Sequence, residues 1–405
     1  MGHIAQQERA VQLGEAEFHS TLGDLYSPWR GARELLLHGR DPYSPEVTRD
    51  IQIEYYGKAL DQSPGGQRDQ QRFVYPVYVA FLLAPSAKFS FAPVRAVSRW
   101  ILLAITLVSI LLWLPLVRGR LSVLSFLAPA VLTISSIPVI QALNLQQLGL
   151  LVAGLLAGCA ALLLRRHYVW AGMMLAVASI KPQMSAVISL WLILWAVSEW
   201  SKRKAFLLGF ATMMLALVLA GEWLLAGWIS KFACGTLAYA QYTDSGSWLA
   251  LWLPRPLGLI GTVVLGVGAV LAYWHTRRED PDSPGFAFTF ALMLTITILI
   301  VPATKPVFNQ ILVLPALLLA WHGRRAVWAR GQLCRALLIL WWAIVAAPWV
   351  LAAMVVLVWL LLPVDAVERV WRLPLYMSLL PPLAGLGLLV LMRKDAVKRS
   401  PIRGT

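Results

Sequence analysis

The chain has 405 residues, of which 59% are hydrophobic and 14% charged, and its formal net charge is +15. This composition excludes an ordinary soluble domain, in which about a quarter of the residues are charged. The basic excess does not indicate nucleic-acid binding, because the Lys and Arg residues lie in short loops between apolar runs.

Residues 1–94 form a polar segment in front of the first long apolar run. Ser27-Pro28 predicts a helix start with Ser27 as N-cap, and Gly39 predicts its end. Ser44-Pro45 predicts the start of a second short helix. Both helices are expected to lie along the membrane surface. Segment 73–92 is apolar but interrupted by prolines, which favours an interfacial or re-entrant helix over a membrane span.

Long apolar runs follow almost without interruption, and a helix needs roughly 17 to 25 such residues to cross a bilayer. The run 168–181 is short, and the run 333–362 contains Pro348, which favours one kinked span over two. The sequence predicts an all-α polytopic membrane protein with about eleven transmembrane helices, at 95–117, 121–140, 146–165, 168–181, 183–199, 205–226, 256–275, 286–302, 307–322, 333–362 and 373–392.

The distribution of Lys and Arg between alternate loops predicts the orientation in the membrane. One set of loops carries 18 of them: Arg118, Arg120, Arg165, Arg166, Lys202, Arg203, Lys204, Arg277, Arg278, Arg324, Arg325, Arg330, Arg335, Arg393, Lys394, Lys398, Arg399 and Arg403. The opposite set from Gln141 onward carries six: Lys181, Lys231, Arg255, Lys305, Arg369 and Arg372. The positive-inside rule places the first set in the cytoplasm.

This orientation gives a multi-pass protein of the cell membrane with five parts. They are an extracytoplasmic polar segment at 1–94, a transmembrane module at 95–226, an extracytoplasmic loop at 227–255, C-terminal transmembrane helices at 256–392 and a basic cytoplasmic tail at 393–405. Residues 1–20 contain no apolar run that could carry the polar segment across the membrane. Either a further transmembrane helix precedes this chain or the orientation is the reverse, and we favour the first.

Cysteine and histidine give no sign of a metal site. Cys159, Cys234 and Cys334 are far apart in the sequence, and the six histidines do not cluster. The sequence therefore predicts no metal or other cofactor. Small-residue patterns such as Gly154–Gly158 and Gly261–Gly268 lie inside apolar runs, which favours close helix packing over a nucleotide-binding loop.

Five short motifs occur in a characteristic order in the first 200 residues: Asp24-Leu25-Tyr26, Gly39-Arg40-Asp41-Pro42-Tyr43, Phe73-Val74-Tyr75-Pro76, Asn144-Leu145-Gln146-Gln147 and Ala178-Ser179-Ile180-Lys181-Pro182. Together they make the chain resemble glycosyltransferase family 87. These are GT-C membrane enzymes, which include polyprenol-phosphate-mannose-dependent mannosyltransferases. The chain departs from the family pattern because the helix that normally precedes the acidic loop is absent.

The resemblance implies a GT-C-like helical bundle with an extracytoplasmic active site and no cofactor. It implies inverting transfer of a mannose-like hexose from a polyprenyl-phosphate donor to a lipid or cell-envelope glycan acceptor, among membrane lipids and without nucleic acid. Such a reaction needs a carboxylate to take the acceptor proton and cations to bind the departing phosphate. The implied base is Asp24, and the implied phosphate partners are Lys181 and Lys305.

The other candidate substrate-binding residues are Tyr26, Arg30, Asp41, Tyr75, Asn144, Gln147, Tyr239 and Tyr242. For Asp41, closure of the turn by the side chain is the favoured interpretation, and for the lysines the alternative is snorkelling to the interface.

Two other classes of function stay open. A transporter or flippase would require charged residues in the middle of spans, whereas Glu222 and Glu199 lie near span ends. An O-antigen-ligase-like enzyme would share the extracytoplasmic site.

Overall fold

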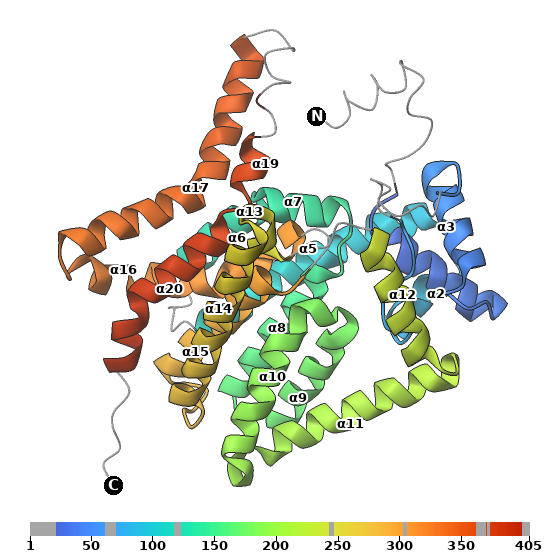
Figure 1. The fold of residues 1–405 in the computed structure, drawn as a ribbon, viewed down its shortest axis with the longest axis horizontal. Coiled ribbons are helices and arrows are strands. Elements are labelled where there is room, and N and C mark those ends of the chain that lie inside the picture. Colours follow the sequence, from blue (N-terminus) through green and yellow to red (C-terminus); the bar gives the residue numbers. More distant parts are fainter. Residues whose placement is uncertain are drawn as a thin grey trace. The chain divides into compact units, whose positions relative to one another are not determined.

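The computed structural model describes residues 22–60, 70–116, 123–242, 247–302, 306–361, 370 and 373–398, and within these ranges the chain is helical without a β-strand (Figure 1). The all-α fold class is therefore confirmed. The α-helices are α2 Tyr26–His38, α3 Pro45–Tyr56, α4 Val79–Leu83, α5 Phe91–Leu116, α6 Val123–Ile134, α7 Ile137–Asn144, α8 Gly149–Leu164, α9 Tyr168–Val177, α10 Pro182–Ser198, α11 Trp200–Leu224, α12 Trp228–Tyr242, α13 Trp248–Trp252, α14 Arg255–Thr276, α15 Pro284–Ile300, α16 Leu314–Trp328, α17 Gln332–Leu361, α19 Leu373–Met377 and α20 Pro381–Lys398. The 3-10 segments are η1 Ala84–Ser86, η2 Ala178–Ile180 and η3 Pro306–Val313.

The chain divides into two compact units. Unit 1 contains residues 1–103, 143–148 and 215–245, so it combines the polar N-terminal segment with two later pieces of the chain. Unit 2 contains residues 104–142, 149–214 and 246–405.

Local sequence signals explain the helices of the polar segment in unit 1. Gly39 ends α2 in the left-handed conformation (φ 65°), and its N–H bonds to the Glu34 and Leu35 carbonyls. Ser44 caps α3 by accepting a hydrogen bond from the Val47 N–H at 3.2 Å. The predicted N-cap role of Ser27 is wrong. Because α2 begins at Tyr26, Ser27 lies inside the helix, and its buried hydroxyl donates to Gln71 Oε1 instead.

Aromatic side chains form much of the unit 1 interior. Tyr26 and Trp29 of α2 are buried and pack against Phe91, with ring centroids 4.9 and 5.1 Å apart. Tyr78 packs edge-to-face on Trp228 of α12 at 5.5 Å. The predicted loop 227–255 is largely helical, since it contains α12 and α13. Trp228 of α12 contributes to this aromatic core.

In the part of the chain that the structure describes, five helices are long and apolar enough to cross a membrane: α5, α11, α14, α17 and the segment Leu373–Arg393. The pair Phe126–Ile134 and Ile137–Asn144, bent by 65°, gives a sixth if it forms one span. The count of eleven is therefore not confirmed. Segments α8, Tyr168–Ile180, α10 and α15 are apolar but have only 10–17 residues, fewer than the roughly 20 that a straight span needs. Pro348 lies inside the single helix α17, as predicted.

The predicted span at 307–322 differs from a regular α-helix. Its first part is the 3-10 segment η3, and α16 begins only at Leu314. Pro315 explains the change, because it has no N–H and its ring clashes with the carbonyl four residues earlier. The proline therefore occupies the first turn of α16, where neither property costs stability.

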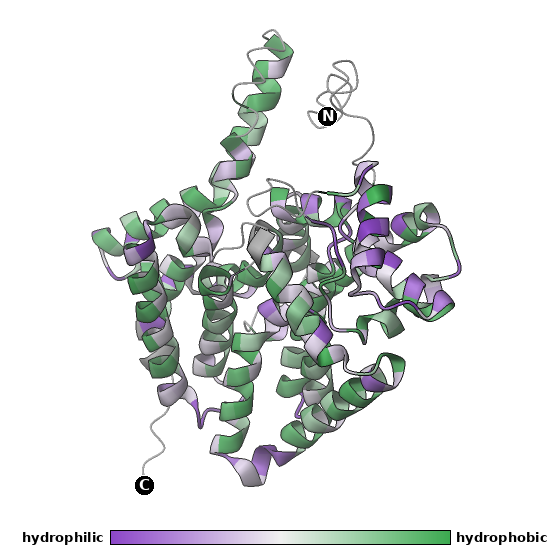
Figure 2. Ribbon diagram, turned by 45° about the vertical axis from the view of Figure 1, so that its right-hand side comes forward, coloured by the Kyte–Doolittle hydropathy of each residue, from purple (hydrophilic) through white to green (hydrophobic). Residues whose placement is uncertain are grey.

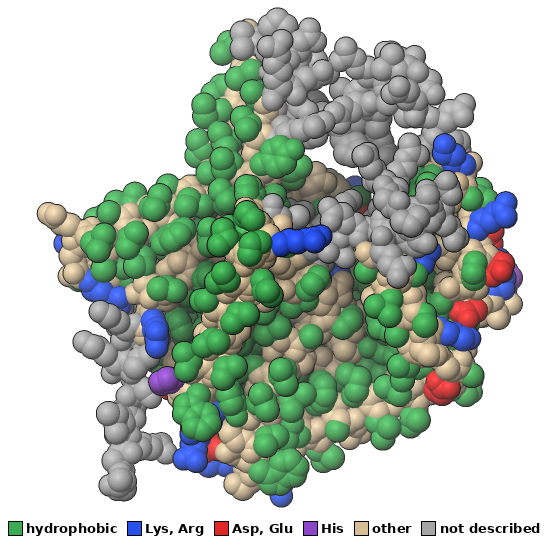
Figure 3. All heavy atoms as spheres, in the orientation of Figure 1, with side chains coloured by type: hydrophobic (Ala, Val, Ile, Leu, Met, Phe, Trp, Pro, Cys, Tyr) green, Lys and Arg blue, Asp and Glu red, His purple; other side chains and the backbone are tan. Residues whose placement is uncertain are grey.

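The hydrophobic character of the helices extends to the surface of unit 2. Figure 2 shows mostly hydrophobic residues along the helices, and Figure 3 shows hydrophobic side chains covering the visible face of α14. Leu259, Val264 and Val270 of α14 are all exposed. Large exposed apolar surfaces are typical of helices that face lipid. The chain is therefore a multi-pass membrane protein.

Some glycines of the apolar helices lie at close helix contacts, and others have open space beside them. A Cβ on Gly154 would lie 2.4 Å from Ile105 Cγ2, which confirms close packing there, whereas Gly266 and Gly268 have nothing within 4 Å. Gly172 of α9 lies in one of the closest contacts. A Cβ there would lie 2.2 Å from the Phe206 carbonyl oxygen of α11.

We expect Gly172→Ala to destabilise the protein, because its methyl group would meet backbone atoms that cannot rotate away. Overpacking of this kind costs about 1–3 kcal/mol, which thermal unfolding in detergent measures as a lower Tm. The matched control is Gly266→Ala on α14, for which we expect an unchanged or slightly higher Tm. Equal melting temperatures for the two variants would contradict the close packing of α9 on α11.

Candidate functional site

The loop that carries Asp24 is held against residues 145–147 in unit 1. The Leu25 N–H bonds to the Leu145 carbonyl at 3.3 Å, and the Tyr26 N–H bonds to the Gly23 carbonyl at 2.9 Å. A Cβ on Gly23 would lie 2.7 Å from the Leu145 carbonyl oxygen and 2.5 Å from Gln146 Oε1. Only glycine therefore lets the acidic loop approach this segment so closely.

The Asp24 carboxylate lies half-buried in a turn immediately before α2. Gln147, which is 7% exposed, donates a hydrogen bond from Nε2 to Asp24 Oδ2. The two motifs that contain these residues are 123 positions apart in the sequence. The fold thus brings the proposed base and one predicted binding residue into direct contact.

Gln146, next to this pair, has two unusual features. Its φ of 49° lies in the left-handed region that non-glycine residues rarely adopt. Its side chain is fully buried, and Oε1 has no hydrogen-bond partner among the described residues. Strained backbone and unsatisfied buried polar atoms concentrate at functional sites. Sequence reasoning included Gln146 only as part of a motif and did not name it as a site residue.

A network of charged groups surrounds α2 and α3. Glu34 is 3% exposed and pairs with Arg30 and, at 2.9 Å, with Arg40. Arg30 also makes two hydrogen bonds of 2.9 Å to Glu54, which accepts a further bond from the Tyr26 hydroxyl. Burial and the neighbouring Glu54 carboxylate raise the pKa of Tyr26 above its usual range. The contacts of Tyr26 and Arg30 are thus structural, and their substrate-binding roles stay predictions.

Asp41 closes the turn between α2 and α3. Its Oδ1 accepts a hydrogen bond from the Tyr43 N–H at 2.9 Å, which agrees with the favoured interpretation. Its Oδ2 pairs with Lys231 of α12 at 2.9 Å. The Tyr43 hydroxyl bonds to the Tyr75 carbonyl at 2.6 Å, and burial together with Asp41 raises the pKa of Tyr43. These contacts join the turn to α12.

Lys181 lies in unit 2, where the helical segments η2 and α10 are separated by one residue. Its backbone is non-helical (φ −131°, ψ 79°), since the following Pro182 disfavours the α conformation of the residue before it. Lys181 is buried, with an exposed fraction of only 7%. A lysine buried at the N-terminus of an apolar helix is costly and is usually functional.

Polar and small residues surround the Lys181 ammonium group. A Cβ on Gly149 would lie 3.3 Å from Lys181 Nζ, 3.5 Å from Asn309 Oδ1 and 3.1 Å from Met184 Sδ. Asn309 is 7% exposed, and its Oδ1 has no hydrogen-bond partner among the described residues. We call Lys181, Gly149 and Asn309 the lysine cluster. Sequence reasoning missed Asn309, although the Asn309-Gln310 pair in an apolar run was a possible signal.

Four predicted site residues remain: Lys305, Tyr242, Asn144 and Tyr239. Lys305 lies outside the described residues, as does the side chain of Tyr242 at the end of α12. Asn144 is exposed and Tyr239 is half-buried. Within the described ranges, His, Cys, Asp and Glu residues form no group of three or more that could hold a metal ion.

We expect Gly149→Val to lower the activity of the protein, because the branched side chain would occupy the space between Lys181 Nζ and Asn309 Oδ1. Displacement of a positioned charge typically costs about 10²-fold in rate. The matched control is Gly158→Val on the same helix, where a Cβ would have only an ordinary contact of 3.8 Å with Met174. Activity measured in membranes should fall only for Gly149→Val, and an equal loss in both variants would contradict a specific role for the cluster.

Comparison with known protein families gives a match. The family model for glycosyltransferase family 87 matches residues 73–302, which is more than half of the chain. Neither the curated proteins nor the solved structures give a significant match. The matched range contains Gln147 and Lys181 but begins after Asp24.

Proposed function

The chain belongs to glycosyltransferase family 87 and is therefore a membrane glycosyltransferase, and we propose that it transfers a mannose-like hexose from a polyprenyl-phosphate donor. The acceptor in this proposal is a lipid or a cell-envelope glycan on the extracytoplasmic face. The anomeric configuration inverts in a single displacement.

Asp24 acts as the general base in this proposal. The carboxylate accepts the proton of the acceptor hydroxyl while the acceptor oxygen forms a bond to the anomeric carbon. The Gln147 amide that donates to Oδ2 holds the carboxylate in one orientation. The bond between the anomeric carbon and the phosphate oxygen breaks, and the leaving phosphate takes the electron pair.

The lysine cluster stabilises the negative charge that grows on the leaving phosphate. Lys181 provides a point charge, and the N-terminus of α10 that begins at Pro182 adds the positive end of a helix dipole. Asn309 Oδ1 is an acceptor without a hydrogen-bond partner among the described residues, and in this proposal it orients the ammonium group rather than binding the phosphate. Lys305 is the second proposed phosphate partner, on the basis of sequence alone.

The single observation that carries the proposal is the Gln147–Asp24 hydrogen bond between two motifs of the family resemblance. The test supplies membranes that contain the chain with labelled polyprenyl-phosphate mannose or with a labelled nucleotide sugar. We expect a new glycoside from the lipid-linked donor only, with inverted configuration by NMR. Label that changes membrane leaflet without a new glycosidic bond would instead indicate a flippase.

A further inference from the structure

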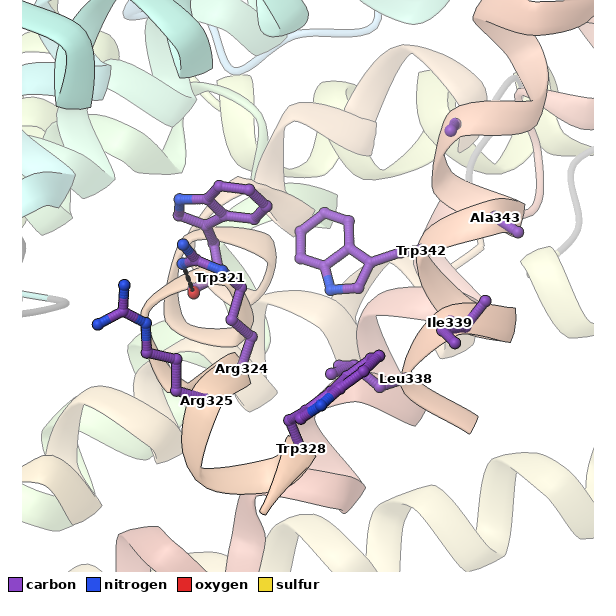
Figure 4. A pocket seen from close by; sticks show the side chains of 9 residues that line it. Trp321, Arg324, Arg325, Trp328, Leu338, Ile339, Trp342 and Ala343 are labelled. Atoms are coloured by element: carbon purple, nitrogen blue, oxygen red, sulfur yellow. Dashed lines mark hydrogen bonds between the residues drawn. The ribbon is translucent and has the colours of Figure 1, made fainter. Parts of the chain in front are cut away.

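A groove of about 670 Å³ lies between α16 and α17 in unit 2 and takes no part in the proposed reaction. Cavities of this size are typical of small-molecule sites. Figure 4 shows side chains from both helices turned toward it, with Trp321 and Trp342 on facing sides. The residues that line it are Trp321, Arg324, Arg325, Trp328, Leu338, Ile339, Trp342, Ala343 and Ala346.

Two arginines give one end of the groove a positive charge. The Arg324 guanidinium stacks on the Trp321 ring at 3.8 Å and donates one hydrogen bond to the Trp321 carbonyl. Arg325 is exposed. Neither guanidinium pairs with a carboxylate among the described residues, so most of their N–H donors are available to an anion.

The rest of the groove is apolar and elongated. Ile339, Ala343 and Ala346 follow one another at helical spacing on α17, along about 10 Å of the helix axis. The two alanines leave room beside the larger tryptophans. Leu338 lies in a buried cluster with Val327 and Leu388, so the base of the groove is firmly packed. This shape suits a hydrocarbon chain.

The two tryptophans of the groove are in direct contact. The Trp321 and Trp342 rings pack edge-to-face with centroids 5.7 Å apart. The Trp342 indole Nε1 is buried and has no hydrogen-bond partner among the described residues, so an occupant of the groove would contact the ring rather than this donor.

We propose that the groove binds one anionic glycerophospholipid of the cytoplasmic leaflet. Its phosphate pairs with Arg324 and Arg325, and an acyl chain lies along Ile339, Ala343 and Ala346. Both arginines belong to the basic loops that the charge pattern assigns to the cytoplasm, where anionic lipids are concentrated. The polyprenyl-phosphate donor is assigned to the opposite face and is therefore not the proposed occupant.

Native mass spectrometry of the full chain tests the proposal, after purification from equimolar phosphatidylglycerol and phosphatidylcholine. We expect the wild type to retain one phosphatidylglycerol, and Arg324→Gln/Arg325→Gln to weaken that retention about tenfold or more. The matched control is Arg277→Gln/Arg278→Gln. Arg277 stacks on Trp274 at 3.7 Å and bonds to its carbonyl in the same manner but lines no part of the groove.

A second variant tests the apolar part without changing charge. Ala343→Phe would fill the groove from an exposed position, and we expect it to abolish retention while the Tm is unchanged. Equal loss in the Arg277/Arg278 control would overturn the proposal, as would equal retention of phosphatidylcholine. Displacement of the bound lipid by a tenfold lower concentration of polyprenyl phosphate would also overturn it, because the site would then belong to the carrier lipid.

Discussion

Asp24→Asn is expected to abolish sugar transfer in membranes without lowering the amount of protein. The substitution removes the proposed proton acceptor but retains an oxygen that can accept the Gln147 hydrogen bond, so the loop keeps its position. Loss of a general base lowers the rate about 10²- to 10⁴-fold. Initial rates of glycoside formation from labelled polyprenyl-phosphate hexose measure this loss.

The control for this prediction is Asp50→Asn in the same unit. Asp50 is 37% exposed and pairs with Arg40 at 2.8 Å on the surface, an interaction worth at most about 1 kcal/mol. We expect nearly wild-type transfer from this variant. Activity of Asp24→Asn within a few-fold of the wild type would remove Asp24 from the mechanism.

Lys181→Met carries the second large expected effect, a fall of about 10²- to 10³-fold in kcat. Methionine fills a similar volume without a charge, so the variant removes the proposed phosphate partner and keeps the packing around Gly149. Because charge grows on the phosphate only as the bond breaks, kcat should fall more than KM rises. Steady-state kinetics at varied donor concentration separate the two parameters.

The matched control is Lys202→Met, which changes an exposed lysine that pairs with Glu199 at 3.1 Å. We expect its kinetic constants to stay close to the wild-type values. The lysine cluster would lose its proposed role if Lys181→Met changed only KM, or if Lys202→Met lost as much activity.

Features that depend on neighbouring residues could be predicted from the sequence. Gly39 ends α2 and Ser44 caps α3 because glycine conformation and serine capping are local effects. Pro348 was correctly assigned to one continuous helix. Ser27 failed as a cap because its hydroxyl bonds to Gln71, a partner 44 positions away that no local pattern indicates.

The site depends on contacts between distant segments, which explains why the sequence predicted its members but not their arrangement. Asp24 and Gln147 were each named, but their hydrogen bond required the close approach of Gly23 to Leu145. Asn309 escaped prediction because its amide becomes notable only when it is buried near Lys181. The count of eleven spans is not confirmed, because hydropathy does not show where an apolar helix ends.

Hexose transfer by the purified chain in lipid vesicles tests the central claim most directly. The vesicles would contain doubly labelled polyprenyl-phosphate hexose and a membrane lipid extract as the source of acceptor. The account predicts that free polyprenyl phosphate and a new inverted glycoside form in equal amounts with the wild type, and that neither forms with Asp24→Asn. Equal product from both proteins, or product from a nucleotide sugar without the lipid-linked donor, would contradict it.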